Sequence, residues 1–528
     1  MITRVKKMRK EVRMLVKCEV NGRVTEENNV VSVSDKQNFI DLLDLDLSEF
    51  EKQFDIIESE PVKDHSQILF SLYEQIDEVD FRNEAGFLND DQKLLQKHFL
   101  VTCVEKILET ADKNNWGVCR NHNFIYLYNG EYWSCVESQD FQIFLGKAAE
   151  KMGVYKFDAR LYTFRRQLLQ QFLSVSRLPK PQQNDNSVLI NLKNGTFEID
   201  GSKMHLRKPD RNDFLTYQLP FPYDEKAECP IFDDYLNTVL PDINRQKILA
   251  EYLGYLFIKT SVLKLEKSLV LYGTGANGKS VFFEIVNALL GGTENVSNFS
   301  LQNLTNENGY FRSMLANKLV NYASEINGKL ETSIFKQLVS GEPVEARLPY
   351  GEPFTLTNYA KLIFNCNELP KDVEVNNAFF RRFLIIPFDV TIPENKQDKQ
   401  LASKIINNEL SGVFNWVLDG LKRLLQQKNF TQCDAVDNIL NKYKRESNTV
   451  ALFIDERYIT STDKFTPLGK LYSDFKSFCK DDNYIPVTKR NFSERIRNLG
   501  ILIERKNYGM AVNVERIIFS TLDNNAVS

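Results

Sequence analysis

Alternating aromatic and polar residues predict two β-hairpins in the first half of the chain. Each has an Asn-Gly pair between its strands, which favours a tight turn because both residue types tolerate a positive φ angle. The hairpins comprise residues 123–135, turning at Asn129-Gly130, and residues 188–199, turning at Asn194-Gly195. Residues 179–187 between them are polar, contain two prolines and show no apolar period, so they indicate a linker.

Helical and strand-like segments alternate through the middle of the chain. Helical patterns occur in residues 139–174, 231–260 and 281–290. Short apolar runs that predict buried strands occur in residues 268–272, 318–323 and 360–366. Because strands that alternate with helices favour a parallel sheet flanked by helices, we expect an α/β fold that extends to about residue 425.

The C-terminal segment has a different pattern. After a charged stretch at 428–447, residues 467–481 and 488–499 have helical periods, and residues 501–506 and 510–514 form a hairpin pattern. Helix, helix and hairpin predict a small winged-helix domain at 445–525. Between residues 489 and 506, six basic residues face two glutamates, which favours contact with a nucleic-acid backbone over a protein-interaction wing. The candidate DNA contacts here are Lys489, Arg490, Arg495 and Arg497.

Length, composition and charge narrow the class of protein and its location. A chain of 528 residues is long enough for two to four domains, and no stretch is apolar for long enough to span a membrane. The basic residues 1–17 lack the apolar run of a secretory signal, so a cytoplasmic protein is expected. The eight cysteines are scattered without a CxxC pair, which indicates reduced thiols and no zinc ribbon. The net charge of −4 is no sign of a nucleic-acid partner, although a ring-shaped motor can concentrate positive charge in its channel.

The most specific motif is a phosphate-binding loop. The pattern GxxxxGK[ST] is filled by Gly273, Thr274, Gly275, Ala276, Asn277, Gly278, Lys279 and Ser280. Glycines let main-chain N–H groups approach phosphate oxygens, and the following helix presents its positive dipole end to the same anion. Lys279 would contact the β- and γ-phosphates of ATP, and Ser280 would ligate Mg²⁺. An apolar strand before the loop and a helical pattern after it make an incidental glycine-rich turn the weaker interpretation.

Polar residues follow the next two predicted strands. Glu325 comes just after residues 318–323, at the sheet edge where ligands bind in open α/β sheets, and is expected to polarise the attacking water and help to hold Mg²⁺. Asn367 follows residues 360–366 and could hold the γ-phosphate or the water through its amide. Asn365, one pleat earlier on the same face, is the alternative.

Two arginines follow these strands in Phe379-Phe380-Arg381-Arg382-Phe383. Arg381 or Arg382 could reach the ATP of a neighbouring subunit as an arginine finger. An ion pair at a helix end is the structural alternative.

The order of these motifs resembles superfamily III helicases, and more narrowly the phage and plasmid primase–helicase family with its poxvirus-type relatives. The likeness rests on GTGANGKS, LVNYASE, FKQLVSGEPVEAR, KLIFNCNELP and FFRRFLIIPF, within residues 268–390. Weaker likeness occurs at YNGEYW, NLKNGTFEID and EYLGYLF upstream and at residues 409–425 downstream. The resemblance implies an AAA+-type motor that assembles as a homo-hexameric ring and moves on single-stranded DNA, typically 3′ to 5′.

The resemblance also implies a hairpin that projects into the channel, between the strand before Glu325 and the strand before Asn367. Its tip would be residues 348–353, and Lys336, Arg347 and Tyr350 are the candidate DNA contacts, against the alternative of a solvated surface turn. Many family members carry a primase domain ahead of the motor. Here Asp44 and Asp46 are the only carboxylate pair found, and they fit an acidic amphipathic helix better, so primase activity is not expected.

The prediction is therefore an ATP- and Mg²⁺-dependent DNA helicase that replicates a phage, plasmid or mobile element. Its partners would be single-stranded and forked DNA and a primase or other replication proteins. The expected domains are a region of unknown role at 1–100, an α+β domain at 101–255, the AAA+ motor at 256–430 and the winged helix. The alternatives are a P-loop ATPase that packages DNA or remodels protein, and a replication initiator that binds nucleotide without turnover.

Overall fold

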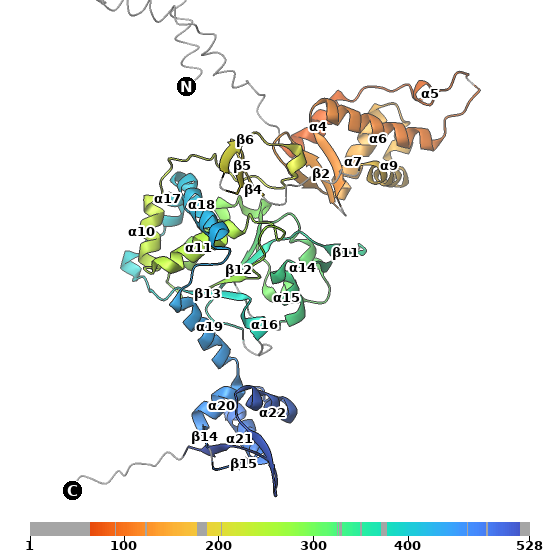
Figure 1. Cartoon of the computed structure of the whole chain (residues 1–528). Coiled ribbons are helices and arrows are strands. Elements are labelled where there is room, and N and C mark those ends of the chain that lie inside the picture. The colour runs from red at the N-terminus through yellow and green to blue at the C-terminus, as the bar shows by residue number, and fades with distance from the viewer. Residues whose placement is uncertain are drawn as a thin grey trace, which may run out of the picture. The chain divides into compact units, whose positions relative to one another are not determined.

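Figure 1 shows the protein as a computed structural model. It describes residues 64–517, apart from 90, 122–123, 177–186, 202, 325, 327–329, 349–350, 371–376, 462 and 482–483. The chain divides into two units, Met1–Val62 and Lys63–Ser528, and every element below belongs to the second. Asp44 and Asp46, and most of the expected linker at 179–187, lie outside the described residues.

The first part of the described chain is a helical cluster on a small antiparallel sheet with the strand order β1-β2-β3. Its elements are α4 (His65–Gln75), α5 (Phe81–Glu84), α6 (Gln96–Lys113), β1 (Gly117–Asn121), β2 (Phe124–Tyr128), β3 (Trp133–Val136), α7 (Ser138–Lys151), α8 (Lys156–Arg160) and α9 (Tyr162–Val175). The first predicted hairpin is confirmed as β2–β3, where Tyr128 pairs with Trp133. The helical segment 139–174 is three helices, because the chain turns at Gly153 with φ 105° and is extended at Leu161.

The second predicted hairpin is also confirmed. It is formed by β4 (Ser187–Leu192) and β5 (Gly195–Asp200), and β6 (Lys203–Arg207) adds a third antiparallel strand. Gly195 has φ 144°, and a Cβ atom at this position would lie 2.4 Å from the carbonyl oxygen of Arg207. The turn therefore needs glycine both for its backbone conformation and for the approach of β6.

A five-stranded parallel sheet forms the centre of the next part. Its strands are β7 (Ser268–Tyr272), β8 (Val296–Ser297), β9 (Val320–Ala323), β12 (Lys361–Cys366) and β13 (Phe383–Pro387). The spatial order is β13-β7-β12-β9-β8, with every neighbouring pair parallel. The three predicted strands and the α/β class are thus confirmed. From β7 the chain crosses to β8 at one edge of the sheet, whereas from β12, the neighbour of β7, it continues to β13 at the other edge. Connections that leave adjacent strands in opposite directions define a topological switch point, and open α/β sheets bind ligands there, outside the carboxyl ends of the strands.

Both faces of this sheet are buried, because alternate residues of each strand enter different cores. In β7, Leu269 and Leu271 belong to one core and Val270 to the other. The first core is completed by α10 (Pro230–Val239), α11 (Ile243–Tyr255), α12 (Lys279–Leu289), α17 (Leu401–Asn408) and α18 (Leu410–Gln427). The second is completed by α13 (Leu301–Thr305), α15 (Thr332–Ser340), α16 (Asn377–Phe380) and α19 (Asp434–Glu446). This burial explains why the strands are continuous apolar runs.

The single helical pattern predicted for residues 231–260 is wrong in one respect. The chain breaks between α10 and α11, because Pro241 has no N–H to donate and Asp242 caps the second helix by accepting from the N–H of Asn244. Both helices pack in the first core, which draws residues from Val188 to Val436 and therefore crosses the domain boundary expected at 255/256.

The C-terminal part has its own core. Its elements are α20 (Thr449–Arg457), β14 (Tyr458–Thr460), β15 (Thr466–Pro467), α21 (Leu468–Asp481), α22 (Lys489–Asn498), β16 (Ile503–Lys506), β17 (Gly509–Val512) and β18 (Val514–Arg516). The two predicted helices and the hairpin are confirmed as α21, α22 and β16–β17. Helix α20 and the short strands β14 and β15 were not predicted. In the described part of the chain, no helix is both long and apolar enough to cross a membrane.

Candidate functional site

The loop from Gly273 to Gly278 lies at the carboxyl end of β7, as its sequence predicts. Gly275 and Gly278 have φ angles of 113° and 86°, and Ala276 adopts φ 48°. Gly278 is the N-cap of α12, so the helix begins at Lys279 with its first N–H groups facing the loop. The loop is held from outside by Ile392, whose N–H donates to the carbonyl oxygen of Ala276 at 2.8 Å.

Gly273 lies at the tightest point of the loop. A Cβ atom here would lie 2.2 Å from Nδ2 of Asn277 and 2.4 Å from the carbonyl oxygen of Phe388. Asn277 is 4 % exposed, and its Nδ2 donates to the same Phe388 oxygen at 3.0 Å. The loop is therefore pinned to the segment after β13, and only glycine fits at its start.

Lys279 turns back into the loop. Its Nζ donates to the carbonyl oxygen of Gly273 at 2.7 Å and to Oδ1 of Asn277 at 3.0 Å, and the residue is 6 % exposed. Burial lowers the pKa of Lys279, whereas the nearby Cys366 thiol acts in the opposite direction. No carboxylate among the described residues pairs with this ammonium group. A phosphate would therefore supply the negative partner that the loop itself does not provide.

Helix α10 packs against the loop, and this contact is not among those predicted from the sequence. The hydroxyl of Tyr235 donates to the carbonyl oxygen of Gly278 at 2.9 Å. A Cβ atom on Gly278 would lie 2.6 Å from Cγ1 of Val239. These side chains precede the loop by about forty residues, and no local pattern marks them as its neighbours.

The asparagine that follows β12 lies beside the loop. The N–H of Gly273 donates to the carbonyl oxygen of Cys366 at 3.1 Å, so Asn367 comes directly after the residue that contacts the loop. Asn367 is exposed. Asn365 is 9 % exposed, and its Oδ1 accepts from the hydroxyl of Tyr322 at 3.0 Å. The geometry favours Asn367 over Asn365 as the polar group available to a ligand.

Three other loop residues, Thr274, Ala276 and Ser280, are exposed, and Ser280 lies in the first turn of α12. Glu325 lies outside the described residues, and the preceding strand β9 ends at Ala323. No group of three or more His, Cys, Asp or Glu side chains within the described ranges could hold a metal ion by itself. The assignment of Ser280 and Glu325 as Mg²⁺ ligands therefore remains a prediction.

The two arginines lie at the amino ends of the strands, whereas the loop lies at the carboxyl ends. The N–H of Ser268, at the start of β7, donates to the carbonyl oxygen of Arg382 at 2.8 Å. Arg382 is 7 % exposed and donates to Oγ of Ser340 at 2.9 Å, while 59 % of the Arg381 side chain is exposed. Both pair with Glu266, at 3.2 Å for Arg381 and 3.5 Å for Arg382. Partial burial opposes ionisation, yet Lys264 and these arginines hold the pKa of Glu266 below its usual value.

The predicted hairpin is formed by β10 (Val344–Arg347) and β11 (Pro353–Leu356), with Arg347 paired to Pro353. Arg347 is exposed, and its Nε donates to the carbonyl oxygen of Gly351 at 2.8 Å. Lys336 lies in α15, outside the hairpin, and Tyr350 lies outside the described residues. Of the two candidate contacts that the structure describes, Arg347 thus lies in the hairpin and Lys336 does not.

The four candidate DNA contacts of the C-terminal part lie on α22, whose first turn is capped by the Thr488 hydroxyl. Lys489, Arg490 and Arg497 are exposed. Arg495 is half-buried, and burial lowers its pKa. Exposed positive charge therefore lies at both ends of this helix.

Three segments of the chain match known families. Residues 93–241 match the family described as "D5 N terminal like", residues 271–382 a family of unknown function (DUF5906), and residues 445–513 the family described as "Poxvirus D5 protein-like". The middle match contains the loop, Asn367 and both arginines, and the last contains α22.

Two curated viral proteins are similar over part of their length. "Putative helicase 121R" of Invertebrate iridescent virus 3 is 22 % identical over 362 residues, which cover 60 % of this chain and 38 % of that protein. "Putative helicase L207/L206" of Acanthamoeba polyphaga mimivirus is 28 % identical over 238 residues, covering 43 % and 24 %. The matched chain thus spans well under half of either relative. Two apo structures of the NrS-1 C-terminal region are 11 % and 12 % identical, cover 77 % of this chain and 97 % of theirs, and give TM-scores of 0.44 and 0.43.

Proposed function

Because the chain is a member of the D5-type primase–helicase family of superfamily III, we propose that it is an ATP-dependent DNA helicase of a viral or other mobile replication system. The observation that carries the proposal is the position of Lys279. Among the described residues, the hydrogen-bond acceptors of its buried ammonium group are neutral oxygens of a glycine-rich loop, and this loop lies at the topological switch point of the parallel sheet.

In this proposal the loop binds the triphosphate of ATP. The N–H groups of residues 274–279 and the start of α12 surround the phosphates, and Lys279 exchanges its contacts with Gly273 and Asn277 for phosphate oxygens. Ser280 and Glu325 would hold Mg²⁺, which neutralises charge on the phosphates when it is bound. Asn367 orients the γ-phosphate or the attacking water from the neighbouring strand.

The parallel sheet order supports an AAA+-type motor, and the location of the arginines supports assembly. Arg381 lies beside the amino end of β7, and the loop follows its carboxyl end, so four residue steps of extended strand, roughly 13 Å, separate the two. It is exposed, so it can serve a neighbouring subunit in a ring. Arg382 is buried against Ser340 and better suited to holding Arg381 in place.

DNA would contact two further parts of the chain. The β10–β11 hairpin carries the exposed Arg347 and would contact the translocated strand, with Lys336 of α15 and Tyr350 as the other candidates. Helix α22 and the β16–β17 hairpin would be the recognition helix and the wing of a winged-helix domain, and the exposed basic residues of α22 would contact phosphates.

The test is the ATPase rate of the full chain and of Lys279→Ala, with and without single-stranded DNA. We expect DNA to stimulate hydrolysis by the wild type and the variant to lose at least about 100-fold in rate. A forked duplex with a labelled strand then measures unwinding. Lys422→Ala, a lysine on α18 that pairs with Asp419, is the matched control and should keep the wild-type rate.

Robust hydrolysis that is indifferent to DNA would overturn the helicase and favour a protein-remodelling ATPase. DNA-stimulated hydrolysis without strand separation would favour a packaging motor. Nucleotide binding without turnover would favour an initiator.

A further inference from the structure

A buried arginine joins the β10–β11 hairpin to the segment between β8 and β9. Arg312 lies in α14 (Tyr310–Ser313) and is 3 % exposed. Its Nε donates to the carbonyl oxygen of Glu345 in β10 at 2.7 Å. Its Nη1 donates to the carbonyl oxygen of Leu304 at 3.2 Å and to that of Asn306. One planar guanidinium group therefore connects a strand of the hairpin to α13 and the turn that follows it.

The hairpin also approaches this segment with its main chain. The N–H of Arg347, at the end of β10, donates to the carbonyl oxygen of Gly309 at 3.2 Å. Gly309 has φ 71°, and a Cβ atom here would lie 3.1 Å from Nη2 of Arg312 and 3.4 Å from Cα of Ala346. A side chain at this position would thus press on both the arginine and the strand. Close contact between the hairpin and α14 therefore depends on glycine at 309.

Burial of the arginine makes this connection resist separation. Burial lowers the pKa of Arg312, and the nearby Glu345 carboxylate opposes the shift. A buried guanidinium group needs acceptors that replace its water, and here they include main-chain oxygens from two stretches of chain. If the hairpin moved away from α13 and α14, Arg312 would lose the acceptor in β10. The cost of that loss holds the two stretches together.

The segment that holds Arg312 is itself fixed to β9. Asn321 is fully buried in β9, and its Oδ1 accepts from the N–H of Phe299 at 2.8 Å. Its Nδ2 donates to the carbonyl oxygen of Phe299, also at 2.8 Å. Phe299 lies two residues before α13, and β9 ends two residues before Glu325. Buried hydrogen bonds thus connect the strand that precedes the predicted catalytic glutamate to the strand that carries Arg347.

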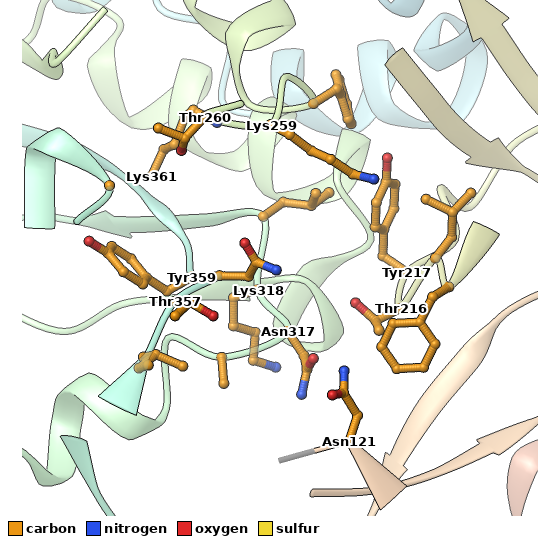
Figure 2. Close-up of a pocket in the computed structure, with 18 of the residues that line it drawn as sticks. Asn121, Thr216, Tyr217, Lys259, Thr260, Asn317, Lys318, Thr357, Tyr359 and Lys361 are labelled. Carbon is orange, nitrogen blue, oxygen red and sulfur yellow. The ribbon is translucent and has the colours of Figure 1, made fainter. Parts of the chain in front are cut away.

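The other strand of the hairpin borders a cavity. Three residues of β11 line a pocket of about 380 Å³, namely Phe354, Thr355 and Leu356. Figure 2 shows this pocket, with Asn317 and Tyr359 among the side chains around it. The Phe354 ring makes an edge-on contact with Phe124, and the Tyr359 hydroxyl donates to the carbonyl oxygen of Glu342, which closes the base of the hairpin on itself. Because packing is incomplete on this side, the position of the hairpin depends more strongly on the contacts that β10 makes.

We propose that Arg312 is the positioning residue of the DNA hairpin. It fixes β10 to the segment that β9 holds, so that Arg347 is presented at one place relative to the candidate ATP site. The inference deepens the proposed function and rests on it, because the hairpin acts on DNA only if the chain is a helicase. Without Arg312 the hairpin still forms, since β10 and β11 pair with each other, but it no longer follows β9.

The test replaces Arg312 in the full chain and observes the hairpin directly. Arg312→Met removes the donors and leaves an unbranched apolar side chain. Hydrogen exchange followed by mass spectrometry should show the amides of β10 and β11 exchanging at least about tenfold faster than in the wild type. Arg423→Met is the matched control, because Arg423 also donates to a main-chain oxygen, that of Lys247, and pairs with the buried Glu251. It should lower the melting temperature without changing exchange in the hairpin.

The response of hydrolysis to DNA is the second readout. The ratio of ATPase rates with and without single-stranded DNA should fall about 2- to 30-fold in Arg312→Met and stay within about twofold of the wild type in Arg423→Met. Gly309→Ala, which keeps the arginine but presses on it, should lower the ratio in the same direction and serves if Arg312→Met fails to fold.

Unchanged exchange in β10 and β11, or a ratio equal to that of the control, would overturn the proposal. A wild type that DNA does not stimulate rejects the proposed function instead, and hydrogen exchange then decides by itself whether Arg312 holds the hairpin.

Discussion

Gly273→Ala is the sharpest probe of the phosphate loop, because it adds one methyl group at a point where the structure has no room. The new Cβ would meet the carbonyl oxygen of Phe388 at 2.4 Å and Nδ2 of Asn277 at 2.2 Å. The Phe388 oxygen belongs to the main chain, and the N–H of that residue donates to Tyr272 at 2.7 Å between β13 and β7. The loop must therefore move, since the strand beside it cannot.

The magnitude follows from the overlap. Carbon and oxygen atoms rest about 3.4 Å apart, so relief needs a shift of about 1 Å, and overpacking of this kind costs about 1–3 kcal/mol. The same shift separates Asn277 from Phe388 and moves Lys279. If the cost is expressed mainly in the nucleotide-bound loop, the affinity for ATP falls by about 5- to 150-fold.

The assay is the dissociation constant of a fluorescent ATP analogue together with the ATPase KM, measured beside thermal unfolding. Gly469→Ala is the matched control, because it lies in α21 with only Lys489 Nζ within 4 Å of the new methyl group, at 3.9 Å. It should leave ATP binding unchanged. Wild-type affinity and KM in Gly273→Ala, at an unchanged melting temperature, would refute the view that this glycine is required by packing around the loop.

Three further predictions test other parts of the molecule. Arg382→Ala should lower the melting temperature by roughly 4–8 °C, because the loss of its buried contacts costs about 2 kcal/mol. Arg381→Ala should leave the melting temperature within about 2 °C of the wild type and reduce hydrolysis, and equal melting temperatures of the two variants would contradict this division of roles. Burial lowers the pKa of Lys361 to about 7 in the folded chain, from an ordinary value of 10.5. Because the unfolded chain binds more protons between these two values, the stability of the folded state should rise with pH above 7. In Lys361→Met the melting temperature should rise less steeply with pH, and an identical slope would exclude this lysine as its source. Arg497→Gln should weaken duplex binding at all sequences alike and reduce the salt slope by about 1, as measured by anisotropy at several salt concentrations; an unchanged slope would argue against a phosphate contact.

Features that depend on nearby residues could be predicted from the sequence. Asn-Gly turns specify the β2–β3 and β4–β5 hairpins because the turn and its strands are contiguous. The loop at Lys279 could be predicted because its chemistry is contained in eight residues, and the strands before Glu325 and Asn367 because burial on both faces leaves an apolar run.

Features that depend on distant residues could not be predicted. Tyr235 and Val239 support Gly278 through packing that no spacing reveals. The break at Pro241 is in principle readable from the missing N–H, but the apolar period on both sides conceals it. Strand β1 and helix α20 are short and gain their stability from tertiary contacts more than from a clear pattern.

The two ends of the parallel strands constrain how copies of the chain could assemble more directly than the sequence motifs do. Asn367 and Lys279 lie at the carboxyl edge, where a triphosphate would bind, and Arg381 lies at the amino edge of the same strands. An arginine side chain extends about 7 Å and cannot cover the roughly 13 Å along β7 to reach the loop of its own chain. If Arg381 acts on the γ-phosphate at all, it must do so on another copy. Under the proposed function, the exposed arginine at the amino ends of the strands and the nucleotide site at their carboxyl ends therefore predict that a neighbouring copy supplies Arg381. Mixing Arg381→Ala with Lys279→Ala chains, each of which should hydrolyse ATP more slowly than the wild type, should then raise hydrolysis above the mean of the two variants, at the interfaces that pair an intact loop with an intact arginine.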